Sequence, residues 1–258
     1  MAFADLALAR RLESAEAANA RACAPPHPGA ASLEIAGGCA IFAGAESPLT
    51  QAVGIGLAGP VGEAQLAGIE AFFRSRGARV SIDLCPLADP GLVEALGARG
   101  YRVMDFNNVL VKRLAGTQIV IAPRVRRAAP DEADLWAHTV GRGFFEQPDL
   151  TSEEMDVGRA IFAMDGALCY LAVSPAGEPA GGGALAVHDG LAALFADSTL
   201  CGFRRQGLQR ELIAARLNEA VALGCDMAMA STEAGSASQR NYERMGFQVV
   251  YTKVTLVG

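Results

Sequence analysis

Two arginines and a glycine stand together in residues 204–207, Arg-Arg-Gln-Gly, where the pattern of apolar residues changes. Residues 191–200 before them are strand-like, and residues 208–223 after them have helical spacing. A strand that turns through a glycine into a helix gathers unpaired backbone N–H groups at the positive end of the helix dipole. With two guanidinium groups beside them, these donors predict a binding site for a pyrophosphate. A solvated helix cap is the alternative interpretation.

A tyrosine stands in the second helix-like segment after this loop. Tyr242 is followed by Glu-Arg-Met-Gly and then by Phe247. A phenol with an ordinary pKa near 10 can donate a proton to a departing thiolate at neutral pH. A core tyrosine that packs beside Phe247 is the alternative.

The loop and the tyrosine together resemble the acetyl-CoA loop and the tyrosine–glycine–phenylalanine element of the GNAT N-acetyltransferase superfamily. The family loop reads Q/R-x-x-G-x-G/A; Arg204 and Gly207 fit it, whereas Gln209 stands where a small residue is usual. The resemblance covers residues 118–258 and is strongest over 194–247. It implies an α+β (mixed α/β) fold, with a mostly antiparallel sheet flanked by helices, and acetyl-CoA as co-substrate without a metal ion.

The resemblance also implies roles for individual residues. Tyr242 would be the general acid, and the strand residues before the loop would offer backbone groups to pantetheine and an amide to the oxyanion. Asp197 is a possible general base and Glu233 is its rival, although both are also readable as ordinary exposed acids. Ser238 is a cofactor ligand or, like Ser236, a helix cap. The predicted cofactor-binding residues are Asp197, Ser198, Thr199, Arg204, Arg205, Gln206, Gly207, Leu208, Gln209, Ser238 and Asn241.

A long-range repeat indicates an internal duplication. The order helix, strand, helix, glycine, aromatic residue and strand in residues 62–111 recurs in residues 208–257. Gly100-Tyr101 in the first copy corresponds to Gly246-Phe247 in the second. We therefore expect two GNAT-like halves, residues 1–114 and 115–258.

The first half lacks the chemistry of the second. Its turn at residues 56–62 contains no cation, Pro60 removes an N–H donor, and Leu96 stands where the second half has Tyr242. These differences predict a degenerate, non-catalytic N-terminal half and a catalytic C-terminal half.

The remaining expectations concern the elements that position these residues. The expected helices are 1–24, 62–76, one opened by Pro90, 131–145, 152–163, 207–223 and 236–245. The expected strands are 32–36, 39–43, 52–57, 80–84, 103–111, 118–122, 167–173, 182–187, 190–197, 226–231 and 247–257.

Composition limits the possible partners. A net charge of -6 disfavours nucleic acid, and no apolar run is long enough for a signal peptide or a membrane span. Six cysteines without metal-ligand spacing predict reduced thiols in the cytoplasm. The sequence leaves open whether the protein is a monomer or a homodimer.

The predicted reaction is direct acetyl transfer from acetyl-CoA to a primary amine of a small molecule or peptide, in a ternary complex. Two alternatives remain at this point. The protein could bind acyl-CoA as a sensor or scaffold without transfer, or it could bind another nucleotide through the same loop in a different fold.

Overall fold

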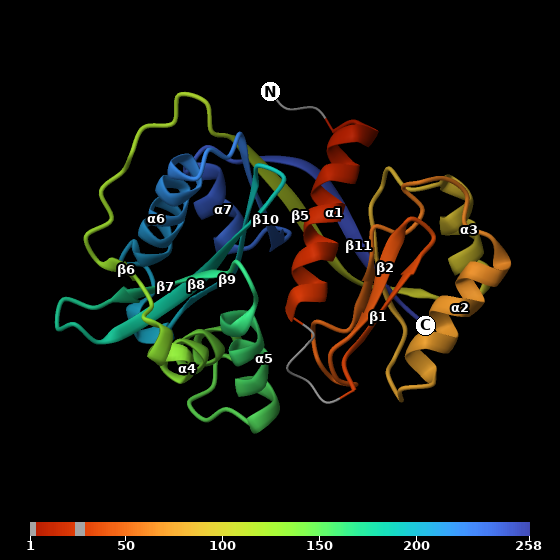
Figure 1. The fold of residues 1–258 in the computed structure, drawn as a ribbon, viewed down its shortest axis with the longest axis horizontal. Helices are drawn as coiled ribbons and strands as arrows, with labels where there is room; N and C mark the ends of the chain where they lie inside the picture. Colours follow the sequence, from red (N-terminus) through yellow and green to blue (C-terminus); the bar gives the residue numbers. More distant parts are fainter. Residues whose placement is uncertain (1–3, 24–28) are drawn as a thin grey trace. The chain divides into compact units, whose positions relative to one another are not determined.

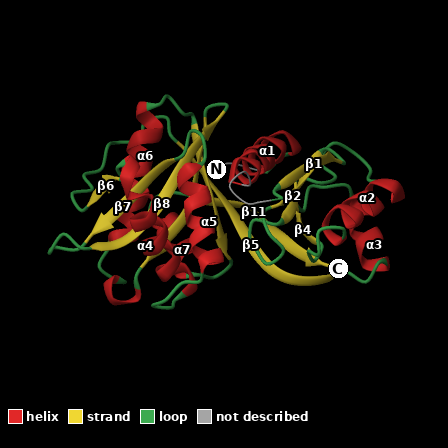
Figure 2. Cartoon of the chain, turned by 60° about the horizontal axis from the view of Figure 1, so that its bottom comes forward, coloured by secondary structure: helices red, strands yellow, loops and turns green. Residues whose placement is uncertain are grey.

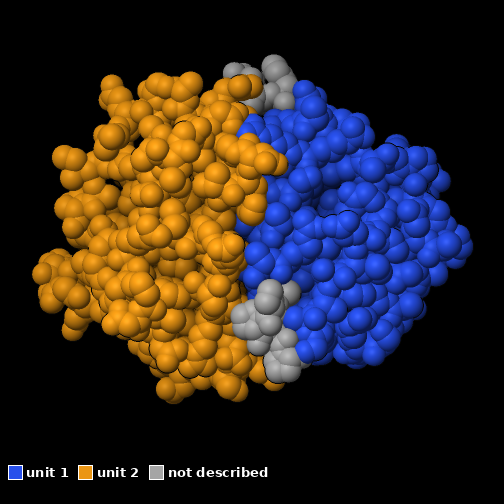
Figure 3. Space-filling view, in the orientation of Figure 1, with its two compact units in different colours: residues 1–109, 232–234, 249–258 blue, residues 110–231, 235–248 orange. Residues whose placement is uncertain are grey.

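The computed structural model describes residues 4–23 and 29–258, and Figure 1 shows its helices and strands. The chain forms two compact units, coloured separately in Figure 3. Unit 1 contains residues 1–109, 232–234 and 249–258, and unit 2 contains residues 110–231 and 235–248. The long strands β5 (Arg102–Arg113) and β11 (Gln248–Val257), together with β10 (Met227–Glu233), contribute residues to both units.

Unit 1 has a mostly antiparallel sheet with helices on both faces (Figure 2). Its strand order is β1-β2-β3-β4-β11, and only the β3–β4 pair is parallel. Alternate residues of β2 point to opposite faces: Cys39 and Ile41 pack with α1, whereas Ala40 and Phe42 pack with the core of α2. The elements are α1 (Leu6–Cys23), β1 (Ala31–Ile35), β2 (Gly38–Phe42), β3 (Gln51–Val53), α2 (Glu63–Arg74), β4 (Ser81–Leu84) and α3 (Pro90–Ala98).

The apolar stripe predicted for the second helix of unit 1 forms its core. Leu66, Ile69, Phe72 and Phe73 of α2 are all buried, at the three- and four-residue steps that place them on one face. Because β3 and β4 are parallel, the chain needs a crossover between them, and α2 provides it.

Unit 2 has the same kind of sheet, with the order β10-β9-β8-β7-β6 and one parallel pair, β9–β10. A Cβ on Gly182 of β8 would meet Val140 and Trp136 of α4, and a Cβ on Gly183 would meet Arg216 of α6. Neighbouring residues of a strand face opposite ways, so α4 and α6 cover opposite faces of this sheet. The elements are β6 (Val125–Arg127), η1 (Pro130–Glu132), α4 (Ala133–Phe145), α5 (Ser152–Ala163), β7 (Leu168–Val173), β8 (Pro179–His188), β9 (Leu191–Thr199), η2 (Cys201–Phe203), α6 (Leu208–Ala222) and α7 (Ala237–Arg244).

These observations confirm the expected mixed α/β class and most of the expected elements. The strand expected at residues 118–122 is wrong. Ile119 and Ile121 are 75% and 84% exposed, and the side chain of Asn218 holds the backbone of Val120 with bonds of 3.1 and 2.8 Å. The edge strand forms later, at β6. The expected strand 52–57 is also too long, since β3 ends at Val53 and Gly54 takes a positive φ of 71°.

Within residues 4–23 and 29–258, no helix combines the length and the apolar composition needed to cross a bilayer.

Candidate active site

The predicted phosphate loop opens helix α6. Gly207 adopts the left-handed conformation, with φ 83°, and Leu208 begins the helix and is buried. The first intrahelical bond is donated by the N–H of Glu211 to the carbonyl of Gly207, at 3.1 Å. The N–H groups before Glu211 have no acceptor within the helix, and residues 204–207 are exposed. This helix end can therefore donate several hydrogen bonds to an anion.

The two arginines of the loop differ in their contacts. The Arg204 guanidinium donates to the carbonyls of Thr199 and Gly143, at 3.1 and 3.0 Å, and to Glu146 Oε1 at 2.7 Å. Arg204 therefore ties the loop to the C-terminal end of α4. Arg205 is exposed and has no hydrogen bond or ion pair among the described residues. Arg205 is the cation of this loop that is free to meet a ligand.

Arg124, just before β6, is bonded to the loop, and the sequence did not predict this contact. Its Nη2 donates to the carbonyl of Gln206 at 2.9 Å, and its Nε donates to Glu211 Oε1 at 2.9 Å. The Glu211 carboxylate also accepts the backbone N–H of Arg124 at 3.1 Å. No spacing rule links residues this far apart in the chain.

Gln209, the departure from the family loop pattern, joins α6 to α7. Its Nε2 donates to Ser238 Oγ at 2.8 Å, and its Oε1 accepts from Asn241 Nδ2 at 2.7 Å. Three of the predicted cofactor-binding residues thus lie together. Ser236, not Ser238, caps α7 by accepting the N–H of Gln239 at 3.1 Å.

The last residues of β9 have a backbone edge that β10 does not use. The parallel ladder between the two strands runs from Leu191↔Met227 to Ala193↔Met229 and stops there. On its other side, β9 pairs with β8 through a bulge: Ala184 faces Phe195, whereas Gly182 faces Ser198. The bulge contains Ala196 at φ 54°, and it changes the direction of the side chain that follows.

Asp197, which follows Ala196 in this bulge, belongs to a buried cluster with Arg216 and Tyr242. Arg216, on α6, is fully buried and bonds both oxygens of the Asp197 carboxylate, Nη1 to Oδ2 at 3.1 Å. Its remaining N–H groups donate to backbone carbonyls, including those of Leu212 and Ala184, both at 3.0 Å. The Tyr242 hydroxyl donates to Asp197 Oδ2. The structure therefore brings together two of the predicted catalytic residues around a third that was not predicted.

Burial and charge both act on the Tyr242 hydroxyl. Burial raises its pKa well above the usual 10, the Asp197 carboxylate raises it further, and the Arg216 guanidinium lowers it. For Arg216, burial alone would lower the pKa, but Asp197 raises it above its usual value. The Tyr242 ring also packs edge-on against Phe247, with centroids 4.9 Å apart. The ring therefore packs as the core interpretation predicts, and the role of the hydroxyl as a general acid stays a prediction.

Small residues make room for the cluster and for the end of β9. A Cβ at position 183 would lie 2.8 Å from Nη1 of Arg216, and one at position 143 would lie 2.1 Å from Ser198 Oγ. Ser198 Oγ is buried without a hydrogen-bond partner in the described part of the chain. An arginine between Leu212 and Leu217 on an otherwise apolar helix face is the signal that could have identified Arg216 from the sequence.

The other predicted base, Glu233, is the last residue of β10 and is exposed. It belongs to unit 1, whereas Asp197 and Tyr242 belong to unit 2. Its role as a base stays a prediction.

Comparisons with known proteins relate part of this chain to one family. Residues 135–247 match the model of the "Acetyltransferase (GNAT) family". No curated protein matches the chain.

Among solved structures, a GCN5-related N-acetyltransferase from Kribbella flavida is similar, with a TM-score of 0.71 and 19% identity, over 97% of this chain and 95% of that one. A tandem GNAT protein from the clavulanic acid biosynthesis pathway has a TM-score of 0.57 and 16% identity, over 76% of this chain and 68% of that one. A putative acetyltransferase of the GNAT family from Novosphingobium aromaticivorans has a TM-score of 0.54 and 18% identity, over 84% and 86%. At these identities the similarity establishes the fold.

Proposed function

We propose that the protein transfers an acetyl group from acetyl-CoA to a primary amine of a small molecule or peptide, because residues 135–247 match the model of the acetyltransferase (GNAT) family. The observation that carries the proposal is the exposed start of α6, opened by Gly207, with the free guanidinium of Arg205 beside it. Transfer would be direct, in a ternary complex.

The residues of the loop fit the cofactor. Backbone N–H donors at a helix start and a cation suit a pyrophosphate, and a Cβ at position 207 would meet only Arg124 Nη2, at 3.6 Å. Residues 194–199 of β9 would offer their free backbone edge to the pantetheine arm, and bound acetyl-CoA would supply the activated acetyl group. Glycine is required at position 207 by its positive φ, not by crowding.

Proton transfer would depend on the charge of the buried cluster. If Tyr242 gives its proton to a thiolate, a phenolate remains beside the Asp197 carboxylate. Arg216 reduces the cost of that state because its charge offsets the carboxylate. Asp197 already accepts from Arg216 and Tyr242, which makes it a better orienting group than a base. Glu233 or a water molecule remains for the amine proton.

A second candidate function follows from one observation. The Tyr242 hydroxyl is fully engaged with Asp197 and its pKa is raised, as in a core residue that does no chemistry. A protein that binds acyl-CoA as a sensor or scaffold would have the same loop and no need of a free acid.

We propose further that residues 1–114 and 115–258 are tandem GNAT-like halves of which only the second is catalytic. The order strand, helix, strand, helix occurs in each unit, as β3-α2-β4-α3 and β9-α6-β10-α7. Pro60 and Leu96 support the loss of the site in the first half. All six cysteines are free thiols, which supports a cytoplasmic location.

Titration calorimetry with acetyl-CoA tests the loop. We expect binding to the full chain and weaker binding to Arg205→Gln, with Arg127→Gln, an exposed arginine of β6, as the matched control. The absence of any heat of binding with acetyl-CoA would contradict the proposal. Thiol release on a panel of amines, compared with Tyr242→Phe, then separates the two functions, because binding without turnover on any amine identifies a sensor.

A further inference from the structure

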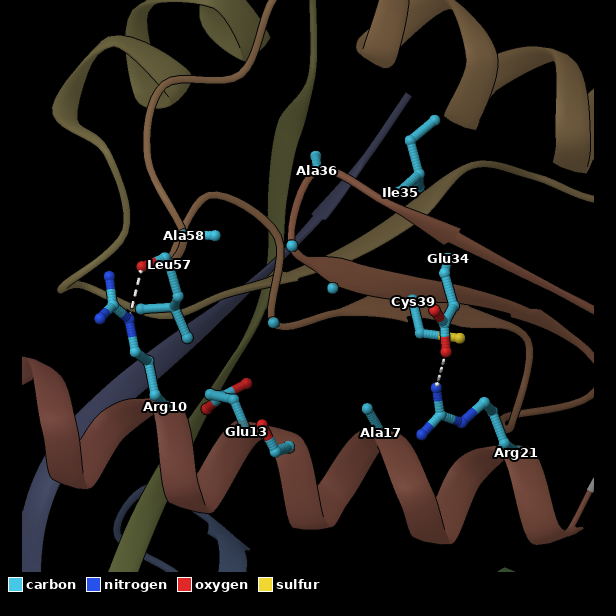
Figure 4. Close-up of a pocket in the computed structure, with 14 residues that line it drawn as sticks. Arg10, Glu13, Ala17, Arg21, Glu34, Ile35, Ala36, Cys39, Leu57 and Ala58 are labelled. Atoms are coloured by element: carbon cyan, nitrogen blue, oxygen red, sulfur yellow. Dashed lines mark hydrogen bonds and ion pairs between the residues drawn. The ribbon is translucent and has the colours of Figure 1, made fainter.

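Unit 1 contains a cavity of about 520 Å³ that has no part in the proposed acetyl transfer (Figure 4). One side is the face of α1 that carries Arg10, Glu13, Ala17 and Arg21. The other side is the turn of the β1–β2 hairpin and the segment that follows β3. A cavity of this size suits a small metabolite.

Glycines and alanines make up much of the wall opposite α1. A Cβ at position 38 would lie 2.2 Å from the carbonyl oxygen of Val53, and one at position 37 would lie 2.4 Å from the Cβ of Ala58. Glycines therefore allow the hairpin turn to pack directly on the segment after β3. Gly54, with φ 71°, redirects the chain at the level of Glu13.

Arg10 presents unused donors to this cavity. Its Nε donates to the carbonyl of Leu57 at 2.9 Å, which fixes the guanidinium plane, and its terminal nitrogens have no partner among the described residues. Arg21, at the other end of the cavity, is already paired with Glu34 at 2.8 Å. Arg10 is therefore the side chain of the cavity that can bind a carboxylate in the forked geometry of a guanidinium.

Glu13 lies one helical turn from Arg10, on the same face of α1 (Figure 4). It is 1% exposed, and its Oε1 accepts from the Tyr251 hydroxyl at 2.7 Å. Its Oε2 is buried without a hydrogen bond, and Lys253 Nζ, 3.7 Å away, is too distant to donate one. An unsatisfied carboxylate oxygen at the edge of a cavity calls for a donor.

The excess of negative charge around Glu13 favours a cationic donor. Lys253 is also paired with Glu16 at 2.6 Å and lies 3.8 Å from Asp83, so one ammonium serves three carboxylates. An ammonium group bound beside Glu13 would reduce this excess of negative charge.

We propose that the cavity binds a free α-amino acid, with its carboxylate on Arg10 and its ammonium on Glu13. Residues three apart on a helix face have their Cβ atoms about 5–6 Å apart. This spacing matches two groups carried on neighbouring atoms of one small ligand. The remaining volume, toward Ala17 and Arg21, would hold the side chain of the amino acid.

Titration calorimetry of the full chain with each of the twenty amino acids tests this site without acetyl-CoA. We expect saturable binding of at least one amino acid. Arg10→Gln should weaken that binding roughly tenfold or more, the effect of losing hydrogen bonds to a charged group. Arg79→Gln, an exposed arginine of the same unit outside the cavity, should leave it unchanged.

The ammonium contact is tested by the deaminated acid that corresponds to the best amino acid. It should bind at least tenfold more weakly to the wild-type protein, and Glu13→Gln should remove most of that difference. If no amino acid binds to the wild-type protein, or if Arg10→Gln and Arg79→Gln bind equally well, the proposal is wrong. Equal binding of the amino acid and its deaminated analogue would also overturn it.

Discussion

Each unit of this protein buries a cation, a carboxylate and a tyrosine hydroxyl together, but the charges are matched in one unit and not in the other. In unit 2, the Arg216 guanidinium donates to both carboxylate oxygens of Asp197, and the Tyr242 hydroxyl donates to the same carboxylate. In unit 1, Lys253 lies among three carboxylates, and Tyr251 donates to Glu13. The first cluster satisfies its polar atoms, whereas the second leaves Oε2 of Glu13 without a bond.

The difference shows what each cluster can do. A matched pair with complete hydrogen bonding fixes a geometry. A cluster with more carboxylates than cations can reduce its excess negative charge when one carboxylate is protonated. Burial raises the pKa of Glu13 from 4.5 to about 7, and this rise persists although Lys253 lowers it. We therefore expect the stability of unit 1 to depend on pH through Glu13.

Replacement of the buried arginine should have the largest effect. Arg216→Met removes the partner of a buried carboxylate, and we expect the free energy of unfolding to fall by about 3–5 kcal/mol. Urea denaturation measures it, with Arg210→Met, an exposed arginine of the same helix, as the control. A loss similar to that of the control would mean that Asp197 is not held by this pair.

The pH dependence of unit 1 should be the next largest effect. Because the pKa of Glu13 is higher in the folded protein than in the unfolded chain, the folded protein binds more protons between about pH 4.5 and 7. The Glu13 contribution therefore favours folding below about pH 4.5 and is lost as the pH rises through about 7. The free energy of unfolding that is lost in this way is at most about 3 kcal/mol.

Glu13→Gln removes this titration, and Glu94→Gln, an exposed acid of the same unit, keeps it. Unfolding by urea at several pH values compares the three proteins. If wild type and Glu13→Gln lose stability in parallel from pH 5 to 7, the two clusters do not differ in the way the structure indicates.

Close packing around Arg216 gives a smaller effect. A Cβ at position 183 would lie 2.8 and 2.9 Å from Nη1 and Cζ of a guanidinium that cannot move without losing its bonds. We expect Gly183→Ala to lower the free energy of unfolding by about 1–3 kcal/mol, as overpacking does. Gly202→Ala, where a Cβ meets nothing within 4 Å, should be close to neutral. Equal melting temperatures for the two variants would contradict the tight packing of this cluster.

The sequence predicted helices and strands better than it predicted which distant side chains bond to one another. The helix predicted at residues 152–163 has the observed bounds, and the structure shows that Thr151 and Glu154 form a capping box at its start. The prediction of a strand at residues 118–122 was wrong because the apolar types of Ile119, Val120 and Ile121 do not reveal that these side chains are exposed. The loop and Tyr242 could be named from their types and spacing. Arg124 and Arg216 could not, since their partners are distant in the chain and only the folded sheet brings them together.

The two tyrosines offer the finest test of the comparison, because each hydroxyl donates to one buried carboxylate. Loss of a hydrogen bond to a charged group is worth about 1.5–3 kcal/mol, so Tyr242→Phe and Tyr251→Phe should destabilise the protein by similar amounts above about pH 7, where Glu13 is charged. Acetyl transfer should separate them. If Tyr242 is the acid, its replacement slows thiol release roughly a hundredfold, the contribution of a general acid, and that of Tyr251 leaves it unchanged. Equal activity in the two variants would show that the tyrosine of unit 2 is, like its counterpart in unit 1, a structural donor only.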